Sequence, residues 1–144
     1  MSTEKIYFSA SEEETEALGA ELARETAPGS IVLLCGDLGA GKTVFSRGFA
    51  RGLGITEPVT SPTYTIVQEY ELDNGGRLYH MDLYRIGDEH AALGFGVDEF
   101  LNDPSAVSLV EWPERIRGLI PDTAIRVELI HRAEDRREIH VTHP

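Results

Sequence analysis

Hydrophobic and polar positions in the first third of the chain predict a strand, a helix and a second strand. Residues 6–8 are a short β-prone run. Ser11 is a candidate helix N-cap and fits a capping box with Glu14. An apolar stripe at helical spacing follows, and the helix that it predicts ends before Pro28. Residues 30–35 are continuously apolar, which is typical of a strand buried on both faces of a parallel sheet.

The rest of the chain alternates between further strands and helices. We expect a helix from about residue 42, then strands at 65–72 and 78–82 joined by a hairpin turn. A weakly helical segment over 88–102 and a strand at 107–110 follow. A short helix at 113–119 then precedes a closing hairpin of 125–130 with 139–141. No internal repeat or linker interrupts this order. The pattern predicts one α/β domain over residues 1–144, with a mixed, mostly parallel sheet flanked by helices and a C-terminal antiparallel hairpin.

Composition and charge narrow the possible functions. A chain of 144 residues is about one domain long. It has 25 acidic against 13 basic residues and a formal net charge of −12, so it lacks the positive footprint needed to hold a nucleic acid backbone alone. Its one cysteine, Cys35, cannot form an internal disulfide, and the acidic N-terminal stretch does not read as an export signal. We therefore expect a cytoplasmic protein without a membrane span.

A phosphate-binding loop is the strongest motif. Residues 36–43 match G-x-x-x-x-G-K-[ST] at every specified position, between the buried strand and an amphipathic helix. The cradle would be formed by the backbone of Asp37, Leu38, Gly39, Ala40 and Gly41. Lys42 would reach the β- and γ-phosphates, and the Thr43 hydroxyl would bind Mg²⁺. The alternative is a glycine-rich turn without a ligand.

Two carboxylates follow apolar strands and are candidates for the magnesium site. Glu111 follows the more apolar strand and is the first choice as a magnesium ligand. Asp82 would either support the metal site without touching the metal directly, or orient the attacking water. Together with Lys42 these residues form the predicted catalytic set.

The sequence favours ATP as the nucleotide. A guanine-reading N-K-x-D segment is excluded, because neither of the two lysines lies in such a context. Thr63 and Tyr64 lie in a loop where a switch would sense the γ-phosphate. Trp112 is next to the predicted metal ligand in the sequence. It is therefore either a residue at a partner surface or a buried core residue. The five histidines show no metal-ligand spacing, and we interpret them as incidental.

Four blocks in a fixed order carry a family resemblance: GDLGAGKT with FSRG (residues 36–48), SPTYT (61–65), YHMDLYR (79–85) and LVEW (109–112). With them the chain resembles the TsaE family, also called YjeE, the small phosphate-loop ATPases of tRNA threonylcarbamoyladenosine biosynthesis. Many ATPases share the first block, whereas the other three at this spacing are specific.

The resemblance implies ATP binding with Mg²⁺ and slow hydrolysis within an assembly with TsaD and TsaB proteins. The tRNA would then be held by the partner. The resemblance also assigns Lys42 and Thr43 to phosphate and Mg²⁺, makes Glu111 and Asp82 the acidic pair, and puts Thr63 and Trp112 in functional loops. It places Arg136 near the nucleotide. Val44 and Asp135 depart from the family pattern, and Asp135 weakens the assignment of Arg136.

Two rival functions remain open at this stage. One is a small phosphate-loop kinase acting on a metabolite, with Arg115 and Arg117 available for a lid. The other is a nucleotide-dependent switch that binds ATP without hydrolysing it.

Overall fold

The computed structural model describes residues 2–37, 39–59 and 66–144 of the chain. Within them, seven strands form one sheet: β1 (Thr3–Ser9), β2 (Ile31–Cys35), β3 (Val67–Glu71), β4 (Arg77–Asp82), β5 (Ala106–Glu111), β6 (Ile125–Ala133) and β7 (Arg136–His143). The helices are α1 (Glu12–Glu25), α2 (Lys42–Gly52), α3 (Glu89–Gly94), α4 (Val97–Leu101) and the 3₁₀ helix η1 (Pro113–Leu119). The predicted order of elements is confirmed.

The sheet has a parallel centre and antiparallel edges. Its strand order is β1-β7-β6-β2-β5-β4-β3, in which β6, β2, β5 and β4 run parallel. The predicted mixed α/β fold with a C-terminal hairpin is confirmed. At one edge of the sheet, β1 pairs antiparallel with β7. Lys5, just before the predicted β-prone run of residues 6–8, lies in this edge strand opposite Val141.

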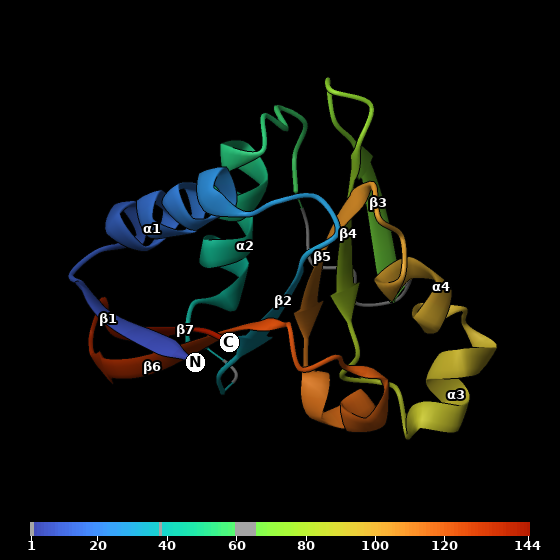
Figure 1. Cartoon of the computed structure of the whole chain (residues 1–144). Helices are drawn as coiled ribbons and strands as arrows, with labels where there is room; N and C mark the ends of the chain where they lie inside the picture. The colour runs from blue at the N-terminus through green and yellow to red at the C-terminus, as the bar shows by residue number, and fades with distance from the viewer. Residues whose placement is uncertain (1, 38, 60–65) are drawn as a thin grey trace.

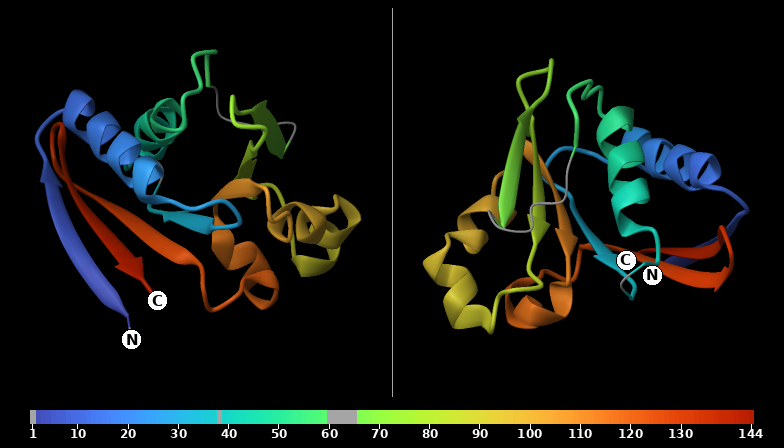
Figure 2. Two further views of the ribbon diagram at one scale, coloured as in Figure 1. Left: turned by 45° about the horizontal axis from the view of Figure 1, so that its top comes forward. Right: turned by 180° about the vertical axis from the view of Figure 1, so that it is seen from behind.

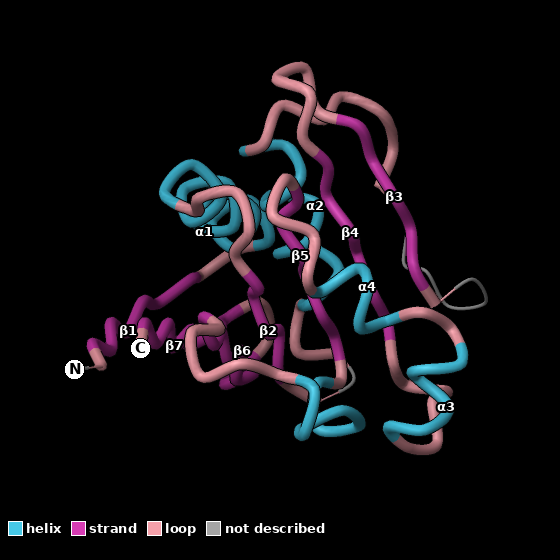
Figure 3. The backbone as a smooth tube through the Cα atoms, turned by 45° about the vertical axis from the view of Figure 1, so that its right-hand side comes forward, coloured by secondary structure: helices cyan, strands magenta, loops and turns pink. Residues whose placement is uncertain are grey.

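Helices cover the two faces of the central strands, as Figures 1 and 3 show. Alternate residues of β2 serve different cores: Val32 and Leu34 pack with α1 and α2, whereas Ile31 and Leu33 pack with α3, α4 and η1. These four side chains are all buried, as the continuous apolar run predicts. Each such burial contributes about 1.5–3 kcal/mol. β2 is therefore held firmly at the centre, and the loop that follows it starts from a fixed point.

Helices α1 and α2 pack closely through small residues. A Cβ atom added at Gly48 would overlap the carbonyl of Glu16 on α1. Glu16 also forms an ion pair with Arg51 of α2. Because the backbones approach so closely here, any larger side chain at position 48 would push α1 away. α1 is thereby held beside the start of α2.

Two segments differ in detail from their sequence predictions. The weak helix expected over residues 88–102 is two short helices, α3 and α4, separated at Phe95 and Gly96. The final hairpin is longer than predicted, and its two strands are joined by Glu134 and Asp135. Figure 2 shows that this hairpin lies at the opposite end of a strongly twisted sheet from β3 and β4.

The carboxyl ends of the central parallel strands meet at one edge of the sheet. Leu34 of β2 pairs with Glu111 of β5, and Glu111 pairs with Asp82 of β4. Ligands of open parallel sheets bind outside these strand ends. The predicted loop and both predicted carboxylates are therefore placed together by the topology.

Candidate functional site

A cavity of about 470 Å³ lies at this edge of the sheet. Among the described residues it is lined by Glu12, Thr15, Gly39, Gly41, Lys42, Thr43, Val44, Asp82, Tyr84, Arg85, Glu111, Trp112, Asp135 and Arg137. The walls come from α1, the start of α2, the ends of β4 and β5, and the final hairpin. Six residues predicted to bind phosphate, metal or water are among them: Gly39, Gly41, Lys42, Thr43, Asp82 and Glu111.

The start of α2 forms an open cradle on this cavity. Gly41 is the N-cap with φ 101°, a left-handed conformation that suits glycine, and no side chain caps the helix. The first turn of α2 contains no acidic residue. Backbone N–H groups at a helix start have no intrahelical acceptor and carry a partial positive charge, so this turn suits an anion.

The Lys42 side chain lies against an aromatic wall. Its Nζ is 4.2 Å from the centroid of the Trp112 ring, and the lysine is buried. Trp112 in turn contacts Tyr84, with ring centroids 5.0 Å apart. Trp112 has φ 59° and ψ 50°, a left-handed conformation that a bulky residue rarely adopts. The backbone thus turns sharply after Glu111 and brings the indole over the ammonium group.

The two predicted carboxylates lie on the same face of the sheet, in register on β4 and β5. Asp82 accepts a hydrogen bond from the backbone N–H of Tyr84 at 3.0 Å. Glu111 is 4% exposed, and its Oε2 is 2.7 Å from Nε2 of the buried His80. The interpretation of His80 as incidental is therefore wrong. Strand alternation was the available signal, since His80 and Asp82 share one face of β4.

The oxygen groups on the cavity fit a magnesium–phosphate ligand. The Thr43 hydroxyl and the carboxylates of Asp82 and Glu111 line the same space, and all three are hard oxygen donors of the kind that Mg²⁺ prefers. Across the described part of the chain, no group of three His, Cys, Asp or Glu side chains gathers to hold a metal. A cation here would therefore complete its shell with phosphate oxygens and water.

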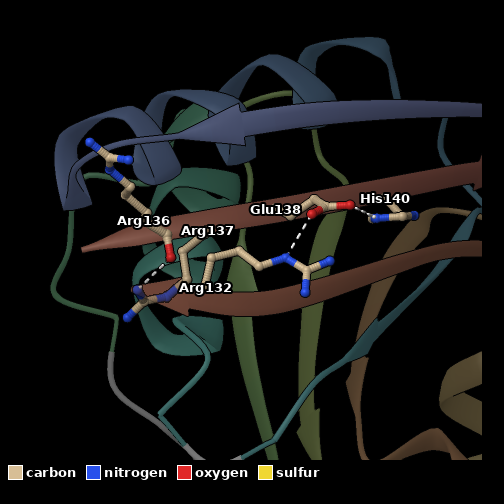
Figure 4. A network of polar contacts seen from close by, with 5 residues as sticks. All are labelled: Arg132, Arg136, Arg137, Glu138 and His140. Carbon is tan, nitrogen blue, oxygen red and sulfur yellow. Dashed lines mark hydrogen bonds and ion pairs between the residues drawn. The ribbon is translucent and has the colours of Figure 1, made fainter. Parts of the chain in front are cut away.

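The arginine that reaches the loop is Arg137, one position after the predicted Arg136. Its Nε donates to the carbonyl of Ala40 at 2.8 Å, and its Nη2 donates to the carbonyl of Gly39 at 3.3 Å. Arg136 is exposed, and Figure 4 shows the two side chains leaving β7 in opposite directions. Strand parity explains the difference, because Arg137 shares its face with the buried Ile139.

Position 35 borders the loop at the end of β2. Arg126 donates from Nη1 to the Cys35 sulfur at 3.2 Å. Burial raises the pKa of the Cys35 thiol above its ordinary value, although the nearby Arg126 partly opposes this. The thiol is therefore poorly ionised near neutral pH and is not a nucleophile candidate.

Some predicted residues lie outside the described part of the chain, and some lining residues were not predicted. Leu38, Thr63 and Tyr64 belong to the first group. The second group includes Glu12 and Thr15, which α1 brings to the cavity from a segment with no motif of its own. Only the packing of α1 on α2 places them there.

The sheet with its strand–loop–helix unit places the fold in the phosphate-loop class of α/β proteins. The family model described as "Threonylcarbamoyl adenosine biosynthesis protein TsaE" matches residues 9–139, and the chain belongs to this TsaE family. The resemblance predicted from the four sequence blocks is confirmed.

Curated relatives and a solved structure agree with this assignment. A tRNA threonylcarbamoyladenosine biosynthesis protein TsaE from Bacillus subtilis is 45% identical over 90% of this chain and 80% of its own length. The protein of the same name from Treponema pallidum is 38% identical over 92% of this chain and 96% of its own length. A crystal structure of Bacillus subtilis YdiB has a TM-score of 0.83 and 38% identity, and covers 99% of this chain and 87% of that one.

None of the helices in the described ranges is both long and apolar enough to cross a bilayer.

Proposed function

We propose that this chain binds ATP with Mg²⁺ in the cavity at the start of α2 and hydrolyses it to ADP and phosphate. This ATP hydrolysis would serve the threonylcarbamoyladenosine modification of tRNA in the cytoplasm, together with TsaD and TsaB proteins. The observation that carries the proposal is that the open start of α2, Lys42 and the two carboxylates Asp82 and Glu111 line one cavity. Family membership supports the tRNA-modification role.

The binding step follows from the positive elements of the cavity. The N–H groups at the start of α2 would hold the β-phosphate, and Lys42 would reach between the β- and γ-phosphates. Lys42 lies against Trp112 at 4.2 Å, so the aromatic ring limits where the ammonium can move. Arg137 holds the carbonyl side of the same loop, which keeps the N–H side turned toward the ligand.

The hydrolytic step would use the oxygen groups. Thr43 and Glu111 would hold the cation, and Asp82 would orient a water molecule toward the γ-phosphorus. When bound, Mg²⁺ neutralises charge that develops on the phosphate oxygens. The water oxygen would form a bond to phosphorus and give up a proton to a phosphate oxygen, as the bond to the β–γ bridging oxygen breaks and ADP leaves with that oxygen.

The charge of the chain supports a partner that holds the tRNA. The net charge of −12 opposes direct contact with a polyanion, and three exposed acids, Glu12, Glu13 and Glu14, lie in the first turn of α1 beside the cavity. An assembly in which another protein contacts the tRNA avoids this repulsion.

Nucleotide binding is tested with the only two lysines in the sequence. Lys42→Ala removes the ammonium from the cavity, and we expect the affinity for ATP to fall at least a hundredfold by isothermal titration calorimetry. Lys5→Ala is the matched control, because Lys5 is exposed on β1, and its affinity should equal that of the wild type. Equal affinities for both variants would place the nucleotide elsewhere.

Hydrolysis is tested with γ-labelled ATP, with and without TsaD and TsaB proteins. Glu111→Ala should keep most of the ATP affinity but lose Mg²⁺-dependent release of phosphate. Normal hydrolysis by this variant would transfer the metal role to Asp82. Label appearing on a small metabolite instead of in free phosphate would identify a kinase, and tight binding at background turnover would identify a switch.

A further inference from the structure

Glu111 is held in an unusual position for a carboxylate that faces a ligand. It is 4% exposed at the end of β5, and its Oε2 is 2.7 Å from Nε2 of His80 on the neighbouring strand β4. His80 is 2% exposed and does not line the cavity among the described residues. The imidazole therefore contacts the carboxylate from the protein side, while Glu111 itself borders the cavity.

The chemistry of the two groups favours one direction for this hydrogen bond. A carboxylate that binds a cation is ionised and only accepts hydrogen bonds, so His80 would donate from Nε2. The other ring nitrogen, Nδ1, is buried without a hydrogen-bond partner in the described structure. A proton on Nδ1 would be left without an acceptor, so the surroundings favour the ring with its hydrogen on Nε2.

We infer that His80 is a positioning residue for Glu111: it fixes Oε2 and leaves Oε1 as the oxygen that meets the cation. This inference rests on the proposed function, in which Glu111 binds Mg²⁺. A carboxylate held on one oxygen offers a single, oriented ligand to a cation that demands near-octahedral geometry. Outer partners of this kind typically change metal affinity or activity by about 10–100-fold when removed.

The two amide side chains separate this role from simple filling of the core. In Gln the amide nitrogen lies about as far from the backbone as Nε2 of histidine, whereas in Asn it corresponds to Nδ1 and does not reach Glu111. His80→Gln therefore keeps a donor for Oε2, and His80→Asn does not. A residue that only filled space would change stability with side-chain volume but would leave the Mg²⁺ dependence of the rate unchanged.

The test uses the full chain with TsaD and TsaB proteins. We expect His80→Asn to lower kcat for ATP hydrolysis about 10–100-fold and to raise the Mg²⁺ concentration for half-maximal rate about tenfold. Its affinity for ADP without Mg²⁺, measured by calorimetry, should stay within about twofold of the wild type. His80→Gln should stay within about threefold of the wild type in all three quantities.

A second comparison tests whether the effect of His80→Asn depends on the presence of Glu111. In a Glu111→Ala background, His80→Asn should not weaken the affinity for ADP with Mg²⁺ any further, because the group that it positions is gone. Additive losses would overturn the inference, as would equal behaviour of folded Gln and Asn variants. If the Asn variant does not fold, loss of turnover in a folded Gln variant overturns it.

Failure of the proposed function would look different. A wild-type chain whose phosphate release and ADP affinity do not respond to Mg²⁺ would overturn both proposals. A wild-type chain that responds to Mg²⁺, with His80→Asn indistinguishable from it, would overturn the role of His80 alone.

Discussion

The two longest helices of the described structure begin in opposite ways. Ser11 caps α1 by accepting from the N–H of Glu14 at 3.2 Å, and Glu14 Oε2 accepts from the N–H of Ala10 at 2.6 Å. α2 begins at Gly41 with no side-chain cap and no acid in its first turn. A capped start stabilises its own helix, whereas an open start leaves donors for something else to satisfy. The stability that α2 lacks at its start is supplied by burial of Phe45 and Phe49.

The largest expected effect is a loss of ATP affinity when an acidic residue, such as α1 has at its start, is placed at the start of α2. Gly41→Asp would put a negative charge at the cradle, and Gly41→Asn would add a neutral side chain of the same shape. Both residues tolerate a left-handed φ better than most. Repulsion of about 4 kcal/mol between charges 4 Å apart corresponds to roughly a thousandfold loss of ATP affinity for Asp relative to Asn. Calorimetry at low salt measures it, and equal affinities would contradict an anion site at this turn.

A smaller effect is expected from removing the cap of α1. Ser11→Ala should lower the free energy of unfolding by about 1 kcal/mol, because the N–H of Glu14 loses its acceptor. Urea denaturation measures the loss, and Ser11→Asn, which keeps a capping oxygen, is the control. The ATP affinity of Ser11→Ala should stay within about twofold of the wild type. A large fall in affinity would mean that ATP binding depends on the cap that holds the α1 wall of the cavity.

The smallest effect is expected at a carboxylate far from the cavity. Asp103 accepts from the Ser105 hydroxyl at 2.7 Å, from the Ser105 N–H at 2.9 Å and from the Tyr79 hydroxyl at 2.8 Å. These donors, the Ser105 hydroxyl foremost, lower the pKa of Asp103 below its ordinary value.

The sign of the pH dependence follows from that lowered pKa. The carboxylate contributes stability above the unfolded-state pKa of about 3.9 and loses it as the pH falls through the lower folded-state value. The wild type should therefore exceed Asp103→Asn in urea midpoint at pH 7, and the gap should narrow toward pH 3. A gap that widens in acid would contradict the direction of the shift.

An ion pair on the last hairpin also shifts a pKa but has little effect on stability. Glu138 accepts from Nε of Arg132 at 2.7 Å and lies 2.8 Å from the His140 ring, as Figure 4 shows. These neighbours, Arg132 first, lower the pKa of Glu138. Because Arg132 is exposed, the pair is screened by solvent and adds little to stability.

The sequence was sufficient for features encoded by neighbouring residues. The open, glycine-rich start of α2 was predictable from its spacing, and the placement of Asp82 and Glu111 at strand ends from the apolar runs before them. Ser11 and Glu14 were likewise recognisable as a local cap.

Features that depend on distant pairing were missed. The contact between His80 and Glu111 joins residues 31 positions apart, and strand alternation indicates only that His80 shares a face with Asp82. Glu12 and Thr15 reach the cavity only through the packing of α1 on α2. Arg137 was an avoidable miss, because counting back two from the apolar Ile139 gives the inward-facing position.

The pairing of β1 with β7 has a consequence for synthesis on the ribosome. Thr3 lies opposite His143, so β1 has no neighbour in the sheet until β7 has been made. Until then, β1 exposes the apolar side chains of Ile6 and Phe8 together with backbone N–H and C=O groups that have no partner strand. The sheet of the nascent protein thus stays unfinished until residues 136–143 have been made.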